Sequence, residues 1–152
     1  MSKKIHRCQF EGCKEKVRPI SNGRFKDKYC NFHRNKVTIE RFLCRVYSNM
    51  SDRTKGKGTN RPDLYIGKAI VTREVFYMWS RNHPEFLRLY KTWVNCGFDR
   101  RFTPSVNRLT SKRGYTIDNM EWVTNSQNCR LATAVRDLNY KKEIYRLIGI
   151  NK

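Results

Sequence analysis

Three cysteines and a histidine near the N-terminus constrain the fold of this chain more than any other feature. They form two close pairs, Cys8-x4-Cys13 and Cys30-x2-His33, within residues 1–36, where large aliphatic side chains are few. Such a stretch cannot bury much of a core, whereas Zn²⁺ takes thiolate and imidazole ligands tetrahedrally and couples its binding to folding. Four protein ligands leave no open position, so we expect a structural zinc site. The alternative is two unrelated pairs of reduced cysteines with a chance histidine.

The charge balance indicates the kind of partner. Lys and Arg number 33 against 13 Asp and Glu, a net charge of +20 in 152 residues. Such an excess repels itself unless a polyanion neutralises it, so nucleic acid is the expected partner. A membrane surface is the competing interpretation, but no apolar run approaches the ~20 residues of a membrane span, and the N-terminal MSKKIHRC lacks the apolar core of a signal peptide. We therefore expect a cytoplasmic protein with reduced thiols and no membrane association.

Apolar periodicity predicts helices in the middle of the chain. Large apolar residues recur at helical spacing over 37–50, and the polar, turn-rich segment 51–62 (SDRTKGKGTNRP) follows as an expected mobile basic linker. A second helix is predicted over 72–82 with Thr72 as its N-cap, and a third from Pro84 to a stop at Gly97. Cys44, Cys96 and Cys129 fall on apolar faces of predicted helices, where buried free thiols are expected.

The C-terminal third has the pattern of a hairpin followed by a helix. Residues 105–110 and 120–124 predict two strands joined by a long loop, residues 125–135 predict a helix, and helical periodicity resumes from 138. The expected fold class is α+β. We divide the chain into a zinc-binding module (1–36), a helix with a basic linker (37–62), a main domain (63–136) and a helical tail (137–152).

The segment TPSVNRLTSKRGYTIDNMEWVTNSQNCR, residues 103–130, resembles the catalytic region of phage HNH endonucleases. Their common pattern runs PS-[VI]-D-R-[IL]-D, then GYT-x-x-N, then W-x-T-x-x-x-N. The stretch CQFEGC…YCNFH also resembles a small zinc module that often precedes phage HNH domains. The resemblance implies a ββα-metal motif within 63–136, and a DNA endonuclease of the freestanding or intron-encoded homing kind.

The resemblance also implies roles for individual residues. One divalent ion, Mg²⁺ or Mn²⁺, is expected between Asn107 on the first strand and Asn128 on the helix, and Asn119 matches a structural asparagine that ties the loop across the hairpin. Arg108 occupies the slot where many members place the general base. Because arginine cannot be deprotonated at physiological pH, we expect it to hold a phosphate instead.

Asn107 departs from the family pattern, which has a metal-binding Asp there. An Asn carbonyl can ligate Mg²⁺ but carries no charge, so metal affinity should fall. Three explanations stay open: an engineered Asp→Asn change, natural loss of cleavage in a protein kept for DNA binding, or an enzyme that works weakly. Asp118 and Glu121 could supply the missing charge, although a surface loop and a solvent-facing strand position are the simpler expectations. His83 precedes Pro84 and is expected at a helix boundary rather than as a base.

Basic clusters predict the surface for double-stranded DNA. A solvated basic face is the alternative for any single run, but the total excess favours phosphate contact for the set. The leading hypothesis is an HNH endonuclease, favoured as a monomer that nicks because it has one site. The alternatives are a non-catalytic nucleic-acid-binding protein (a DNA regulator or an RNA- or ribosome-associated factor) and, with little support beyond charge, a DNA-packaging protein. The predicted DNA-binding residues are Arg53, Lys55, Lys57, Arg61, Arg100, Arg101, Lys112 and Arg113.

Overall fold

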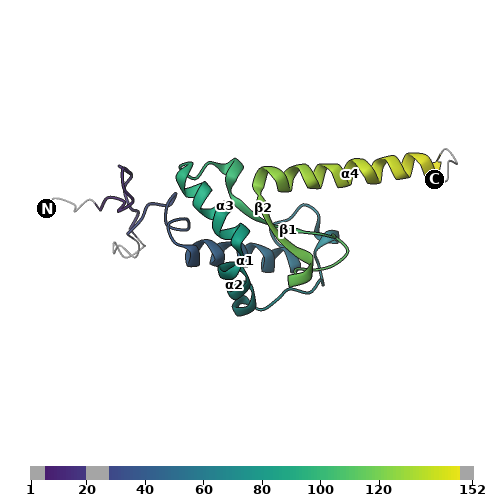
Figure 1. The fold of residues 1–152 in the computed structure, drawn as a ribbon, viewed down its shortest axis with the longest axis horizontal. Helices are drawn as coiled ribbons and strands as arrows, with labels where there is room; N and C mark the ends of the chain where they lie inside the picture. The colour runs from purple at the N-terminus through teal and green to yellow at the C-terminus, as the bar shows by residue number, and fades with distance from the viewer. Residues whose placement is uncertain (1–5, 20–27, 148–152) are drawn as a thin grey trace.

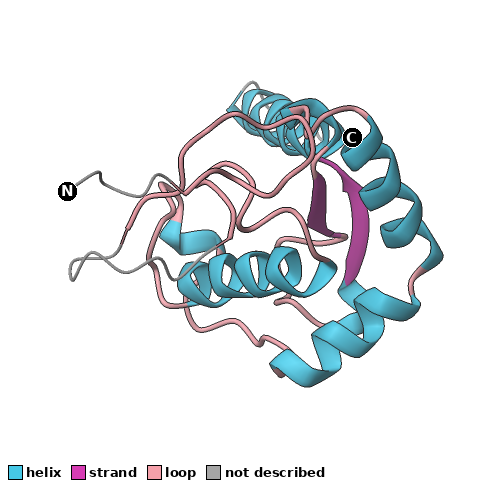
Figure 2. Ribbon diagram, turned by 90° about the vertical axis from the view of Figure 1, so that its left-hand side faces the viewer, coloured by secondary structure: helices cyan, strands magenta, loops and turns pink. Residues whose placement is uncertain are grey.

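Helices gather around a small hairpin in a mixed α and β fold (Figures 1 and 2). The computed structural model describes residues 6–19 and 28–147, with side chains as far as residue 138. The order of elements agrees with the expected α+β class. The elements are α1 (Ile39–Thr54), α2 (Arg73–Asn82), α3 (Pro84–Asn95), β1 (Pro104–Arg108), β2 (Met120–Thr124) and α4 (Asn125–Leu147), with short 3-10 turns at Pro62–Leu64, Arg100–Phe102 and Ile117–Asn119.

Helix α1 is longer than its apolar pattern predicts. It begins after Thr38, whose Oγ1 accepts a hydrogen bond from the backbone N–H of Arg41 (3.2 Å). It continues to Thr54, so the prediction that the mobile linker starts at residue 51 was wrong. The last turn continues because Arg53 packs over the ring of Tyr65 and hydrogen-bonds the hydroxyl of Tyr115. A tertiary contact therefore extends the helix beyond the end of its apolar periodicity.

Helices α2 and α3 confirm the start signals read from the sequence. Thr72 caps α2 by accepting from the backbone N–H of Val75, and Pro84 occupies the first turn of α3. His83 lies at the boundary between the two helices, as expected, with its ring against Trp79 (5.1 Å between centroids). The helices bury an aromatic core that also receives Trp122 from β2. Its fully buried side chains include Phe42, Phe76, Phe86 and Trp93.

The two strands form one antiparallel hairpin whose register sets the two faces. Val106 pairs with Trp122, and both are buried against the helical core. Because side chains alternate along a strand, the neighbouring pair Asn107 and Glu121 lies on the opposite face. The first strand ends at Arg108 rather than at residue 110, since the next backbone N–H groups are taken by Asn119.

Helix α4 is one continuous helix, where a helix over 125–135 and a separate tail from 138 were predicted. Figure 1 shows its C-terminal part extending beyond the rest of the molecule. The side chains from Cys129 to Leu138 are all exposed. Residues 148–152 of the predicted tail, and residues 1–5 and 20–27 of the predicted zinc module, lie outside the described residues.

The prediction of three buried free thiols was wrong. Cys44, Cys96 and Cys129 are all exposed. Cys129 lies on an exposed flank of α4, and Cys96 is exposed because it caps the C-terminal end of α3. Apolar periodicity predicted these helices, but it did not predict which side of each helix would be buried at its edges.

Candidate functional site

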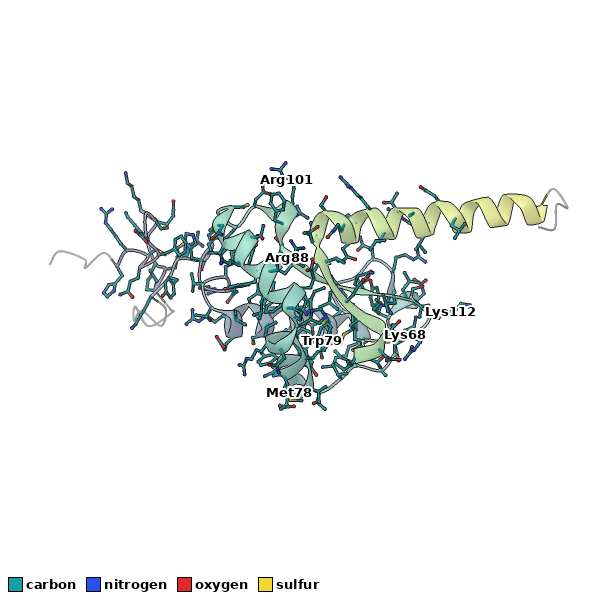
Figure 3. All side chains as sticks on the ribbon, viewed as in Figure 1. Lys68, Met78, Trp79, Arg88, Arg101 and Lys112 are labelled. Carbon is teal, nitrogen blue, oxygen red and sulfur yellow. The ribbon has the colours of Figure 1, made fainter. Side chains whose placement is uncertain are left out.

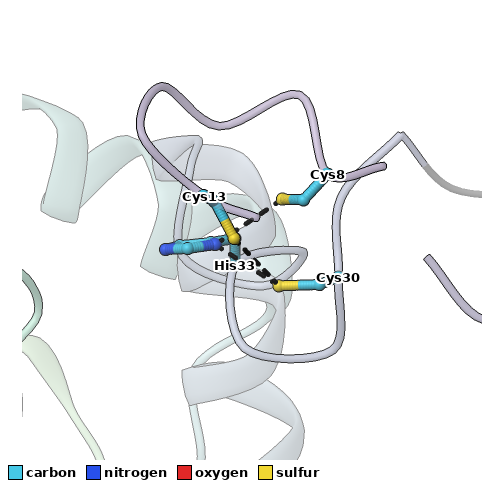
Figure 4. A group of neighbouring side chains, drawn as sticks. All are labelled: Cys8, Cys13, Cys30 and His33. Carbon is cyan, nitrogen blue, oxygen red and sulfur yellow. Dashed lines mark hydrogen bonds between the residues drawn. The ribbon is translucent and has the colours of Figure 1, made fainter. Parts of the chain in front are cut away.

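The three cysteines and the histidine of the N-terminal module come together, as their spacing predicted. The Nδ1 atom of His33 lies 3.3 Å from Sγ of Cys30 and 3.6 Å from Sγ of Cys8, and the Sγ atoms of Cys13 and Cys30 are 4.0 Å apart (Figure 4). All four ligand atoms lie within 4.8 Å of one another. Three of the four residues are buried, and Cys13 is half-buried.

Three of the separations between these atoms, 3.3, 3.6 and 4.0 Å, are close to those that a tetrahedral metal ion requires. Zn–S and Zn–N bonds of ~2.3 and ~2.0 Å at tetrahedral angles place neighbouring ligand atoms roughly 3.5 to 3.8 Å apart. Burial, together with the charge of Lys36, lowers the pKa of His33 below its ordinary value, so its imidazole is neutral at pH 7. Neutral imidazole is the form that ligates metal. The cluster can therefore bind a metal ion such as zinc.

Aromatic packing joins the cluster to the helical body. The ring of His33 stacks on Phe10 (4.1 Å between centroids) and lies 5.7 Å from Phe98, which in turn contacts Trp93 of α3 (5.0 Å). Phe98 has a φ of 64°, an unusual value for a bulky residue, and is buried. The hydroxyl of Tyr90 on α3 also donates to the carbonyl of Lys36 (2.6 Å). His33 is thus connected to Trp93 in the core of the body through two ring contacts, His33 with Phe98 and Phe98 with Trp93.

The hairpin carries the second group of predicted site residues. Asn107 faces Glu121 across the strands, and its Nδ2 donates to Glu121 Oε1 (2.7 Å). Both side chains are half-buried. Glu121 lies on the strand face away from the core, as expected, and the strand register also places it against Asn107. Asp118 behaves as expected of a surface loop acid and pairs with Arg113.

Arg108 holds together the segments around the hairpin loop. Its guanidinium lies over the ring of Tyr65 (4.3 Å) and near that of Tyr115 (5.3 Å). Its Nη1 donates to the carbonyls of Leu64 (2.9 Å), Arg113 (3.0 Å) and Ser111 (3.4 Å). These contacts give Arg108 a role in organising the loop, which the sequence did not suggest. Its role in holding a phosphate stays a prediction.

Asn119 is the buried centre of that loop. Its Oδ1 accepts from the backbone N–H of Thr110 (3.0 Å), and its Nδ2 donates to the carbonyls of Thr110 (3.1 Å) and Gly114 (2.8 Å). Gly114 itself lies so close to Ala69 that an added Cβ would be 2.0 Å from the Ala69 carbonyl oxygen. The next residue, Tyr115, exchanges backbone hydrogen bonds with the same segment. The loop is therefore fixed from inside by one amide and from outside by residues 69–71.

The start of α4 is fixed to the open end of the hairpin. Thr124 and Gln127 form a reciprocal capping box, in which the backbone N–H of Thr124 donates to Gln127 Oε1 (2.8 Å) and that of Gln127 to Thr124 Oγ1 (3.2 Å). The N–H of Asn125 donates to the carbonyl of Thr103 (2.8 Å), which precedes β1.

Asn128 is half-buried in the first turn of α4, the helix that packs against both strands. Among the described side chains, Asn107 and Asn128 do not hydrogen-bond to each other.

The predicted DNA-binding residues fall into three groups. Arg53 is half-buried against Tyr65 and Tyr115. A second group consists of exposed arginines that each pair with an aspartate close in sequence: Arg61 with Asp63, Arg101 with Asp99 and Arg113 with Asp118. The third group is exposed and, within the described part of the chain, forms no ion pair: Lys55, Lys57, Arg100 and Lys112.

Further basic residues, which the sequence did not single out because they stand outside charged runs, add to this surface. Arg88 and Arg130 line a groove of about 420 Å³ between α3 and the start of α4, together with Arg101. Figure 3 shows Arg88 and Arg101 on that side, with Lys68 and Lys112 at the far end of the body by the hairpin loop. Basic side chains thus occupy both ends of the hairpin.

Two further findings concern membrane spans and similarity to known proteins. Within the described ranges, none of the helices combines the length and apolar character needed to cross a bilayer. A scan against protein-family models and searches of curated proteins and of solved structures found no match to this chain.

Proposed function

We propose that this protein is a metal-dependent DNA endonuclease of the HNH type. The observation that carries the proposal is the hairpin followed by a helix, with its loop fixed by Asn119 and an amide–carboxylate pair on the face away from the core. Hydrolysis of a phosphodiester requires a cation to neutralise the scissile phosphate and the leaving oxygen. In this proposal Asn107 and Asn128 supply oxygen ligands to Mg²⁺ or Mn²⁺, and the ion supplies that neutralisation.

The zinc-binding module has a structural part in this proposal. Its four protein ligands would complete the coordination of Zn²⁺ and leave no position for substrate. Its aromatic contacts with Phe98 and Trp93 would let the bound metal stabilise the adjoining end of the body. We therefore assign zinc to folding and the second, hard cation to chemistry.

The nuclease proposal predicts that Asn107→Asp raises cutting activity. A carboxylate binds a hard cation better than an amide does, so nicking of supercoiled plasmid at limiting Mg²⁺ should rise by about tenfold or more, which corresponds to roughly 1.4 kcal/mol. The measurement compares the wild type and Asn107→Asp with Mg²⁺, with Mn²⁺ and with EDTA. Asn128→Ala removes the proposed ligand on the helix. It should abolish nicking both in the wild type and in the Asn107→Asp variant.

A non-catalytic nucleic-acid-binding protein is the second candidate, favoured by the uncharged Asn107 together with the net charge of +20. The same assay separates the two. If neither the wild type nor Asn107→Asp nicks DNA in any metal, while both bind duplex DNA tightly, the binding protein is the correct assignment.

Both candidates predict a steep loss of DNA affinity with salt. Each phosphate neutralised by a basic side chain contributes about −0.9 to the slope of log K against log salt concentration. Replacing Lys55, Lys57, Arg100 and Lys112 together with alanine should reduce that slope by up to roughly 4. The measurement is fluorescence anisotropy with a labelled duplex across a salt series.

The matched control for this experiment uses the ion-paired arginines. Replacing Arg61, Arg101 and Arg113 with alanine should change the slope less per residue, because their charges are already partly offset by Asp63, Asp99 and Asp118. Binding that barely changes between low and physiological salt would contradict a phosphate-contacting surface.

A further inference from the structure

The carboxylate that β1 lacks lies directly across the hairpin. Glu121 on β2 is the register partner of Asn107, and its Oε1 accepts a hydrogen bond of 2.7 Å from Asn107 Nδ2. The two side chains share the face of the hairpin opposite Val106 and Trp122. Both are half-buried, so they are partly screened from solvent while still reachable.

The hydrogen bond orients the oxygen atoms that remain. Because Asn107 donates through Nδ2, its Oδ1 is the amide atom left to act as an acceptor or ligand. Glu121 engages only Oε1 in this contact, so Oε2 is the second oxygen of the pair. One neutral and one anionic oxygen, held together by a hydrogen bond, are ligands of the kind that Mg²⁺ and Mn²⁺ prefer.

Glu121 differs from three aspartates of this protein that arginines already neutralise. Asp63, Asp99 and Asp118 each pair with an arginine close in sequence. In the described part of the chain, Glu121 forms no ion pair, and its polar contact is the amide of Asn107. The protein carries a net charge of +20, yet the half-buried carboxylate of Glu121 is held by an uncharged amide and not by a basic side chain. Its negative charge is therefore available to a cation.

We infer that Glu121 is a ligand of the divalent ion, so that the anionic ligand of the site stands on β2 instead of β1. This inference rests on the proposed nuclease function. It assigns Asn107 two tasks, which are to contribute its own carbonyl oxygen and to orient Glu121. The site then holds one negative charge at position 121, with neutral amides at 107 and 128.

The test measures Mn²⁺ binding to the zinc-loaded protein by electron paramagnetic resonance, independently of cleavage. Glu121→Gln keeps the shape of the side chain and its hydrogen bond to Asn107 but removes the charge, and it should weaken Mn²⁺ binding by about tenfold or more. The double variant Asn107→Asp/Glu121→Gln moves the charge back to β1 and should restore binding to within a few-fold of the wild type. Glu74→Gln, at an exposed acid on α2, is the control and should leave binding unchanged.

The possible results distinguish the ligand role of Glu121 from the nuclease function on which it rests. If Glu121→Gln binds Mn²⁺ as the wild type does while Asn128→Ala does not, Glu121 is no ligand and the nuclease proposal survives. If neither the wild type nor Asn107→Asp binds Mn²⁺ or nicks plasmid, both statements are overturned. Circular dichroism melting of each variant separates loss of binding from loss of fold, and a folded double variant that fails to recover binding also overturns the inference.

Discussion

Substituting Cys30 with serine should abolish zinc binding and release the N-terminal module from the body. Structural zinc contributes apparent binding free energies of about 10–16 kcal/mol in small modules, and the substitution removes one of the four ligands on which that binding depends. Few apolar side chains in the module are buried, with Cys8, Val17 and Cys30 the buried hydrophobic residues described there. Without the metal, therefore, little holds the module together. Metal analysis should find about one zinc per wild-type chain and none in the variant.

The same substitution should reach the body through the ring contacts of His33. Once His33 and Phe10 no longer cover Phe98, the C-terminal end of α3 loses packing, and we expect the melting temperature of the body to fall by several degrees. Cys96→Ser is the matched control, since Cys96 is exposed and stands outside the cluster. Full zinc occupancy in Cys30→Ser would contradict the four-ligand site.

Gly114→Ala should be the most damaging small change in the hairpin loop. A Cβ at position 114 would lie 2.0 Å from the carbonyl oxygen of Ala69 and 2.7 Å from its nitrogen. These are backbone atoms, so residues 69–71 must move, and with them the hydrogen bonds of Tyr115. We expect a loss on the order of 3 kcal/mol in the free energy of unfolding, measured by urea denaturation.

Gly67→Ala provides the comparison for Gly114→Ala. Gly67 has a φ of 71°, and an added Cβ would meet no atom within 4 Å, so the cost is conformational only, about 1 kcal/mol. If the two substitutions cost the same, the close approach of Gly114 to Ala69 is not a feature of the native state. If Gly114→Ala is the costlier, nicking should fall with it, because Asn119 also depends on the Gly114 carbonyl.

Local signals were predictable from the sequence because their causes are local. Thr72 and Pro84 mark helix starts through contacts within four residues, and the paired spacing of Cys30 and His33 lets one turn of chain present both ligands. The boundaries of β2 were predicted for the same reason, since its apolar alternation is complete between Asn119 and the capping residue Thr124.

What the sequence did not predict depends on contacts between distant segments. The partner of Glu121 follows from a strand register that is fixed across an eleven-residue loop by Asn119 and Gly114, and no short pattern encodes it. The cluster of Arg53 and Arg108 around Tyr65 likewise joins three segments that are far apart in the sequence. The boundary predicted at 136–137, between the main domain and a helical tail, has no counterpart in the backbone, because one helix runs through it.

The free stretch of α4 has a thermodynamic consequence. From Leu131 to Leu138 its side chains are exposed, so the helix there depends mainly on hydrogen bonding and intrinsic propensity, and both are marginal over such lengths. Thr133 and Val135 weaken that propensity further. Its outer turns should consequently exchange amide protons far faster than its capped first turn. A macromolecule that binds along this part of α4 would have to order the outer turns of the helix. Because that ordering costs conformational entropy, the measured affinity would be lower than the contact surface suggests.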